Sequence, residues 1–273
     1  MITLPADART HALMYHDAVS GDPDSSGFPG PGPAHYKLPW ATFVDHLDRI
    51  AAAVSGPPDT VEDVLAGRAG PRSWSLTFDD AGTSALAIGE ELRRRGWRGH
   101  FFVTTGLMGT PGFLAEPGIR ELSGMGHIIG SHSVSHPDRM SALERDEIAH
   151  EWRASVEALS ELIGADIRSA SLPGGHYSRH VALAAADAGI EALFTSEPVR
   201  KPRSVGCLLI GRVSIRRNTS AADAARTAAG DLRPWLREYA AWNLRKPIKA
   251  LGGERYEQLR GRLLGTLAER RHA

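Results

Sequence analysis

The segment Leu76-Thr77-Phe78-Asp79-Asp80-Ala81-Gly82 ends an apolar run on two adjacent carboxylates, and a glycine follows them. Burying even one unpaired carboxylate in a protein core costs several kcal/mol. A buried strand that stops on two acids therefore indicates that a cation lies at its end. Candidate partners occur later in the chain, in the segment Ser131-His132-Ser133-Val134-Ser135-His136-Pro137.

His132 and His136 are four residues apart, a spacing that brings both imidazoles to one metal ion through a helical turn. With Asp80 as the third ligand, coordination positions stay open for water and substrate, as in catalytic rather than structural metal sites. Asp79 is then free to act as a base toward a metal-bound water. Two plainer interpretations stay open: the histidines are ordinary loop residues, and Asp79 caps a helix that begins near Thr83.

On both sides of this motif, short apolar runs alternate with segments of helical periodicity, and such alternation predicts a parallel sheet. The expected strands cover residues 11–15, 74–78, 100–104, 127–129, 167–172, 192–195 and 208–213. The expected helices cover residues 40–54, 83–95, 141–163, 179–188 and 221–229, with Thr83 capping the second and Ser141 opening a capping box in the third. Seven strands without a glycine-rich phosphate loop favour a β/α barrel over a dinucleotide-binding fold.

Composition narrows the class of protein. The chain has 273 residues, of which 42% are hydrophobic, and its formal net charge of +0 provides no global basic field for nucleic acid. A single cysteine, Cys207, excludes an intramolecular disulfide. No run approaches ~18 uninterrupted apolar residues, so no transmembrane span is expected. Because the N-terminus lacks a basic start and an apolar stretch, we expect no signal peptide and predict a cytoplasmic protein.

Two segments depart from the strand–helix pattern. Residues 21–39 are rich in glycine and proline and are predicted to form a long loop, which is either part of a substrate site or a flexible surface insertion. Residues 231–273 follow a barrel domain predicted over residues 1–230 and carry twice as many basic as acidic residues. Because the aromatic residues of this segment need burial, we expect a helical C-terminal extension that packs on the barrel. The alternative is a contact with an acidic partner, and the basic helices also offer a peripheral contact.

Polar residues follow several of the predicted strands. In a β/α barrel the C-terminal strand ends converge on one face, where active sites are built. Four strand ends bring polar or glycine-rich sequence to that face: His16, Asp79 with Asp80, His132, and Pro173-Gly174-Gly175. One such end would mean little, but four together predict a functional site.

These motifs resemble those of the polysaccharide deacetylases, also called carbohydrate esterase family four or the nodulation-type deacetylase domain. The family motif Thr-Phe-Asp-Asp-Gly is matched by residues 77–82 with Ala81 inserted. The family's His-Ser/Thr-x-x-x-His motif is matched approximately by His132 to His136. A third family motif, Arg-x-Pro-x-Gly, is matched in part by Ser171-Leu172-Pro173-Gly174-Gly175. The resemblance extends from about residue 9 to about residue 215.

The resemblance implies a distorted (β/α)7 barrel in which Asp79 is the catalytic base and Asp80, His132 and His136 bind a metal ion. It also implies that the backbone N–H of Gly174 helps to hold the oxyanion. The usual reaction of the family removes an acetyl group from an N-acetylated sugar with a metal-activated water.

The sequence departs from the family pattern at two points. The arginine that orients the base in the third motif is Ser171 here, and Arg212 and Arg168 are both open as replacements. The late histidine that serves as general acid in the family has no counterpart. However, Leu13-Met14-Tyr15-His16-Asp17 resembles the Tyr-His segment of members with permuted motif order, such as those acting on poly-N-acetylglucosamine. This likeness implies His16 as the acid, with His176 as the second candidate.

We therefore expect a metal-dependent hydrolase that de-N-acetylates an N-acetylglucosamine-type unit in a glycan, glycolipid or sugar conjugate. Zn²⁺ is the expected metal because two histidines and one aspartate suit it, and Co²⁺, Ni²⁺ or Fe²⁺ fit the same donors. Two alternatives stay open. One is a catalytically inactive carbohydrate-binding barrel, and the other is a related metal-dependent hydrolase that acts on a non-sugar amide.

Overall fold

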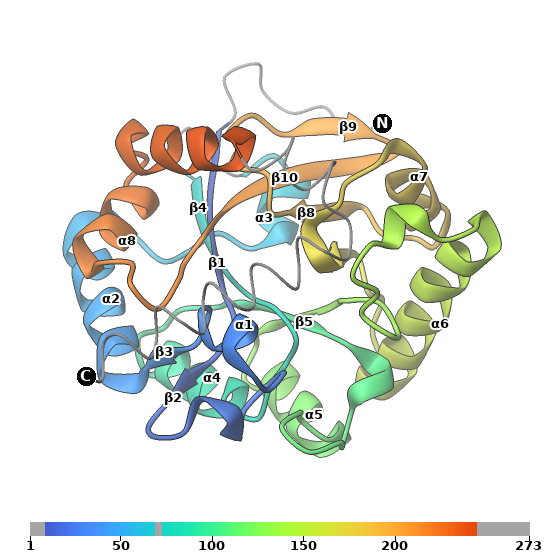
Figure 1. Cartoon of the computed structure of the whole chain (residues 1–273), viewed down its shortest axis with the longest axis horizontal. Helices are drawn as coiled ribbons and strands as arrows, with labels where there is room; N and C mark the ends of the chain where they lie inside the picture. Colours follow the sequence, from blue (N-terminus) through green and yellow to red (C-terminus); the bar gives the residue numbers. More distant parts are fainter. Residues whose placement is uncertain (1–8, 69–72, 245–273) are drawn as a thin grey trace.

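The computed structural model describes residues 9–68 and 73–244, and its centre is a closed barrel of parallel strands (Figure 1). The strands pair in the order β1–β4–β5–β6–β7–β8–β10, and a further pairing of β1 with β10 closes the ring. Their bounds are β1 Thr10–Tyr15, β4 Ser73–Phe78, β5 His100–Val103, β6 Ile128–Ser131, β7 Ser169–Ser171, β8 Ala192–Thr195 and β10 Cys207–Ser214. The predicted (β/α)7 barrel is confirmed, and the short strand β9 (Arg203–Val205) adds an antiparallel edge to β10.

Helices surround the barrel on its outer side (Figure 1). The predicted helices correspond to α2 (Trp40–Ala53), α4 (Ala85–Arg94), α6 (Arg145–Ile163), α7 (Arg179–Asp187) and α8 (Ala221–Ala228). Two further helices, α3 (Val61–Leu65) and α5 (Glu116–Gly124), were not predicted. The proline and glycine in the first turn of α5 hide its pattern in the sequence, although proline is well tolerated there because the first N–H groups of a helix have no intrahelical partner.

The two predicted helix starts are wrong. The helix α6 begins at Arg145, where Glu144 is the N-cap and Glu147 completes a capping box, and Ser141 lies in the preceding 3₁₀ turn η3 (Met140–Ala142). The N-cap of α4 is Ser84 rather than Thr83. The hydroxyl of Thr83 instead donates to the carbonyl of Ser25 at 3.1 Å, so it holds a loop and not a helix end.

Strand pairing places the candidate residues at one level of the barrel. The strands β1 and β4 pair in register from Thr10 opposite Ser73 to Tyr15 opposite Phe78. The backbone N–H of Asp79 then donates to the carbonyl of Tyr15 at 3.0 Å. His16 and Asp79 are therefore the first residues beyond two aligned strand ends. Below this level, the apolar side chains of Ala12, Phe102, Phe194, Leu208 and Ile210 form a cluster inside the barrel.

Residues 21–39 form an ordered segment rather than one continuous irregular loop. They contain the 3₁₀ turn η1 (Pro23–Ser25), the short helix α1 (Pro31–Ala34) and the strand β3 (Leu38–Pro39), which pairs with β2 (Ala18–Val19). The ammonium group of Lys37 is buried and donates to the carbonyls of Pro23, Ser26 and Phe28 at 2.8, 2.5 and 2.6 Å. One buried cation thus satisfies three carbonyls and ties the two ends of this segment together.

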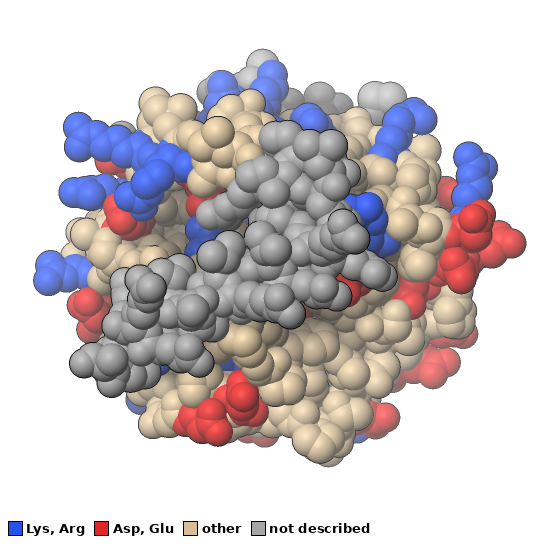
Figure 2. All heavy atoms as spheres, in the orientation of Figure 1, with Lys and Arg blue, Asp and Glu red and all other residues tan. Residues whose placement is uncertain are grey.

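The described part of the C-terminal segment is helical over residues 232–244. Trp235 is buried against His11 of β1, with ring centroids 6.1 Å apart in a T-shaped arrangement. Leu232, Leu236 and Leu244 are exposed on the same helix. In Figure 2, basic side chains lie mainly along the upper edge and upper left of the view, which is the side of this helix in Figure 1. Acidic side chains gather at the right, near α6. The remainder of the predicted extension, residues 245–273, lies outside the described residues.

Within residues 9–68 and 73–244, no helix combines the length and the apolar character needed to cross a membrane.

Candidate active site

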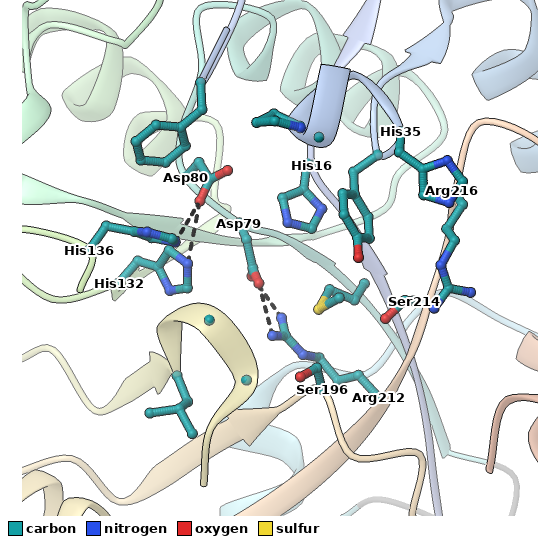
Figure 3. A pocket seen from close by; sticks show the side chains of 18 of the residues that line it. His16, His35, Asp79, Asp80, His132, His136, Ser196, Arg212, Ser214 and Arg216 are labelled. Atoms are coloured by element: carbon teal, nitrogen blue, oxygen red, sulfur yellow. Dashed lines mark hydrogen bonds and ion pairs between the residues drawn. The ribbon is translucent and has the colours of Figure 1, made fainter. Parts of the chain in front are cut away.

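A cavity of about 880 Å³ opens at the C-terminal ends of the barrel strands (Figure 3). All four predicted strand ends contribute to its lining. The sequence-predicted residues that line it are His16, Asp79, Asp80, His132, His136, Gly174 and Gly175, and the second acid candidate His176 lines it as well. Pro173 is buried in the adjoining 3₁₀ turn η4 (Pro173–Gly175).

Asp80, His132 and His136 form the geometry of a metal site. Asp80 Oδ1 lies 3.4 Å from His132 Nε2 and 3.6 Å from His136 Nε2. This buried oxygen has no hydrogen-bond partner among the described residues. Two ligands of a tetrahedral ion with bonds of 2.0–2.1 Å lie roughly 3.3 Å apart. The carboxylate oxygen lies near this distance from each imidazole nitrogen, and all three candidate ligand atoms lie within 4.8 Å of one another. The donor set therefore fits a divalent metal.

The backbone around this cluster is held in an unusual conformation. Asp80, Ala81, Ser133 and His136 are the non-glycine residues with positive φ in the described part of the chain, with φ of 75°, 58°, 65° and 56°. Such conformations are uncommon for residues other than glycine and cluster at functional sites, where the surrounding structure maintains them. All four belong to the two loops that carry the metal-site candidates.

Glu151 of α6 maintains the histidine loop. Its carboxylate accepts from the backbone N–H groups of Val134 and Ser135 at 2.8 and 2.9 Å, and from the Ser135 hydroxyl at 2.6 Å. Sequence reasoning missed this residue. An acid on the buried face of a helix is the signal that marks it, because a buried carboxylate requires donors.

His132 has a defined tautomer. Its Nδ1 lies 2.8 Å from the carbonyl oxygen of Ser171, which can act only as an acceptor. Nδ1 therefore carries the proton, and the lone pair of Nε2 faces Asp80 and His136. Metal-binding histidines commonly have such a partner on the other ring nitrogen.

The carboxylates and imidazoles adjust one another's protonation. Burial opposes ionisation of Asp80, but its contact with His132 and the charges of His16 and His136 lower its pKa well below the usual range. Burial would lower the pKa of His132, whereas the carboxylates of Asp79 and Asp80 raise it. The pKa of His136 is lowered, first by burial and then by His132.

Asp79 forms a fully buried bidentate ion pair with Arg212 of β10. Arg212 Nη1 donates to Asp79 Oδ1 at 2.7 Å, and Nη2 donates to Oδ2 at 2.9 Å (Figure 3). Burial would raise the pKa of Asp79, but the charge of Arg212, followed by that of His132, lowers it. The Asp79 carboxylate is therefore ionised at neutral pH. Because it is held inside the barrel by Arg212, it does not cap the following helix.

Arg212 takes the place of the missing third-motif arginine. Its Nη2 also donates to the Ser171 hydroxyl at 2.7 Å, and that hydroxyl donates to Asp79 Oδ2 at 3.0 Å. The other candidate, Arg168, lies on the outer surface, where it pairs with Glu191. Alternation along β10 explains the position of Arg212. Successive side chains of a strand point to opposite faces, so Arg212 shares the inward face with Leu208 and Ile210.

The glycines of the η4 turn have no room for side chains. Gly174 has φ of 64°, and a Cβ atom there would lie 2.1 Å from the carbonyl oxygen of Asp138. Gly175 has φ of 70°, and a Cβ atom there would lie 2.2 Å from the Ser196 hydroxyl. The turn therefore presents bare backbone to the cavity, close to the loop that carries His136.

His16 lies one residue beyond β1 and points into the pocket beside Asp79 and Asp80 (Figure 3). The centroid of its ring is 4.9 Å from that of Tyr36. Its Nδ1 is buried without a hydrogen-bond partner among the described residues. His16 is close enough to both aspartates to lower their pKa values. The structure thus places both acid candidates, His16 and His176, on the cavity wall.

Together, the barrel and its site define a hydrolase-type (β/α)7 barrel with a buried carboxylate beside an Asp/His/His metal-site candidate. Residues 66–193 match the family model described as polysaccharide deacetylase. No match was found among curated proteins.

Solved structures share the fold. The Streptococcus pyogenes deacetylase PplD, in complex with acetate, is 20% identical with a TM-score of 0.67, covering 81% of this chain and 98% of PplD. IcaB from Ammonifex degensii is 21% identical with a TM-score of 0.63, covering 83% of this chain and 99% of IcaB. A polysaccharide deacetylase from Bacillus cereus is 18% identical with a TM-score of 0.67, covering 81% of this chain and 69% of the other.

The metal-site geometry generates a first prediction. Replacing His132 with alanine removes one of three ligands, so the metal content of the purified protein should fall sharply. Elemental analysis measures this directly. The matched control is His176→Ala, which changes another histidine of the same cavity outside the ligand cluster and should keep the wild-type metal content. Full metal content in His132→Ala would refute the ligand assignment.

The buried ion pair generates a second prediction. The substitution Arg212→Met leaves the Asp79 charge buried without a partner and should destabilise the protein by about 3–5 kcal/mol at neutral pH. Adding Asp79→Asn should recover part of that loss, as a double-mutant cycle measured by denaturant unfolding would show. Additive costs of the two substitutions would contradict the coupling.

The same pair predicts the direction of a pH dependence. The pKa of Asp79 in the folded protein lies below its unfolded value of about 3.9. Its stabilising contribution is therefore present above that pH and is lost as pH falls through the folded pKa. The stability difference between wild type and Asp79→Asn should shrink on acidification.

Proposed function

We propose that this protein removes the acetyl group from an N-acetylated sugar by hydrolysis of the acetamide. The observation that carries the proposal is the Asp79 carboxylate, which Arg212 orients and keeps ionised beside the cluster of Asp80, His132 and His136. A fixed carboxylate next to a three-ligand metal site is the arrangement that activates water for attack on an amide.

Asp80, His132 and His136 would hold the metal ion. Two imidazoles and one carboxylate suit Zn²⁺, and Co²⁺, Ni²⁺ or Fe²⁺ fit the same donors. When bound, such an ion supplies Lewis-acid polarisation and lowers the pKa of water.

The remaining steps belong to residues of this chain. Asp79 accepts a proton from the attacking water while the water oxygen bonds to the acetamide carbonyl carbon. The backbone N–H of Gly174 helps to hold the oxyanion that develops on the former carbonyl oxygen. His16 then donates a proton to the nitrogen as the C–N bond breaks, so acetate and a free amino sugar leave.

An active enzyme is favoured over an inactive carbohydrate-binding barrel. Two departures from the family motifs support the inactive alternative, the absent third-motif arginine and the absent late histidine. Arg212 supplies an arginine to Asp79 from another strand, and His16 lies on the cavity wall as a candidate for the histidine's role. A metal-dependent hydrolase acting on a non-sugar amide stays as the second alternative. Acetate release from N-acetylglucosamine oligomers and nucleotide-linked sugars, with and without chelator and added Zn²⁺, separates these possibilities.

The permuted-motif subgroup, the cytoplasmic location and the peripheral contact through the basic C-terminal helices stay sequence-based predictions.

Loss of the base should abolish most of the activity. Asp79→Asn removes the proton acceptor and should lower acetate release by roughly 10²–10⁴-fold. Its metal content should stay at the wild-type level, because Asp79 is outside the ligand cluster. Near wild-type turnover of this variant at neutral pH would show that Asp79 has a structural role and that the proposed chemistry is wrong.

The acid assignment is tested by two matched histidine variants. His16→Ala should keep its metal, lower kcat by about 10²-fold and remove the basic limb of the pH–rate profile, because the leaving nitrogen then lacks its proton donor. His176→Ala should have a much smaller effect on kcat. If the two outcomes are reversed, the acid comes from the loop that follows Gly175.

A further inference from the structure

The helix at residues 232–244 turns one face toward the barrel and its cavity. Trp235, Glu238 and Trp242 are spaced three and four residues apart, which places them on that face. Tyr239 of the same helix is 50% exposed. The inner face is therefore built from two tryptophans and one acid, and each of them meets a different part of the barrel.

Glu238 anchors the middle of this face. Its carboxylate accepts two hydrogen bonds from Arg216, at 2.8 and 2.5 Å, and both side chains are largely buried. Bidentate arginine–carboxylate pairs fix orientation as well as distance. Arg216 follows β10 and lines the cavity, so this pair ties the helix to the rim of the active site.

Trp242 lies one turn beyond Glu238 and is half-buried at the cavity wall. Its ring carbon Cη2 lies 3.5 Å from the position that a Cβ atom on Gly175 would occupy. The indole therefore packs over the glycine turn that follows β7. A side chain from the C-terminal segment thus forms part of the wall next to the proposed oxyanion turn.

The segment at residues 21–39 supplies further aromatic wall. Phe28 lies 4.8 Å from the His136 ring, and Tyr36 lies 4.9 Å from the His16 ring. Aromatic side chains from two distant parts of the sequence therefore line the cavity that contains Asp79. At about 880 Å³ the cavity is near the upper end of the range for small-molecule sites. It has room for more than one sugar ring.

We propose that Trp242 is a sugar-binding residue that stacks on the ring next to the reacting acetamido sugar. Sugar rings present C–H faces that pack on the flat surface of an aromatic side chain. The C-terminal helix then belongs to the substrate site and favours a glycan chain over a single sugar. This inference rests on the proposed function and adds to it the class of substrate.

The test compares Trp242→Ala with Tyr239→Ala, which changes an exposed aromatic residue of the same helix. The substrates are N-acetylglucosamine and its tetramer. Trp242→Ala should raise KM for the tetramer about tenfold, with kcat and the kinetics on the single sugar nearly unchanged. Trp242→Phe should restore most of the loss, and Tyr239→Ala should behave as wild type. Equal losses on both substrates through kcat would indicate a structural role and overturn the proposal.

Binding provides a readout that does not need turnover. In the Asp79→Asn background, calorimetry with the tetramer should show affinity about tenfold weaker when Trp242 is also replaced by alanine. Unchanged affinity would overturn the proposal for Trp242. If the wild-type protein binds the tetramer through Trp242 but releases no acetate, the proposed function fails and the binding site stands.

Discussion

The ion pair of Asp79 and Arg212 joins β4 to β10 inside the barrel, and the rest of the site is arranged around it. Arg212 is fully buried and also donates to the hydroxyls of Thr77 and Ser171 and to the carbonyl of Thr195. All of its N–H donors are therefore used, and four strands meet at one guanidinium. A charge buried in this way is tolerated because its hydrogen bonds are complete. The pair is thus a structural centre of the barrel and also the device that orients the candidate base.

Ser171 couples the base to the metal-site candidates. Its hydroxyl contacts Asp79 and Arg212, while its carbonyl oxygen accepts the Nδ1 proton of His132. One residue of β7 therefore contacts both the Asp79 carboxylate and the ring of His132, a candidate metal ligand. Ser171 lies where the family motif has its arginine, and here Arg212 reaches the Asp79 carboxylate from β10.

The site consists of a rigid floor and added walls. The floor is made of strand ends, whose positions follow from parallel pairing. The walls come from the segment at residues 21–39, which follows β1, and from the helix at residues 232–244, which follows β10. In the first segment, the Lys37 ammonium group donates to three backbone carbonyls. In the helix at residues 232–244, Glu238 pairs with Arg216, which follows β10. In this arrangement the strand ends carry the candidate catalytic residues, and the two segments line the remainder of the cavity.

By itself, the sequence determined the barrel and the candidate ligands, because strand–helix alternation and strand-terminal polar residues are local patterns. It left Arg212 and Arg168 as equal candidates, and it did not reveal Glu151 or the part that Trp242 plays in the wall. Only the tertiary structure decided these points. Arg212 and Asp79 are 133 residues apart, and no local pattern encodes a contact over that separation. Such contacts depend on which strands become neighbours when the barrel closes and on which buried charges then find partners.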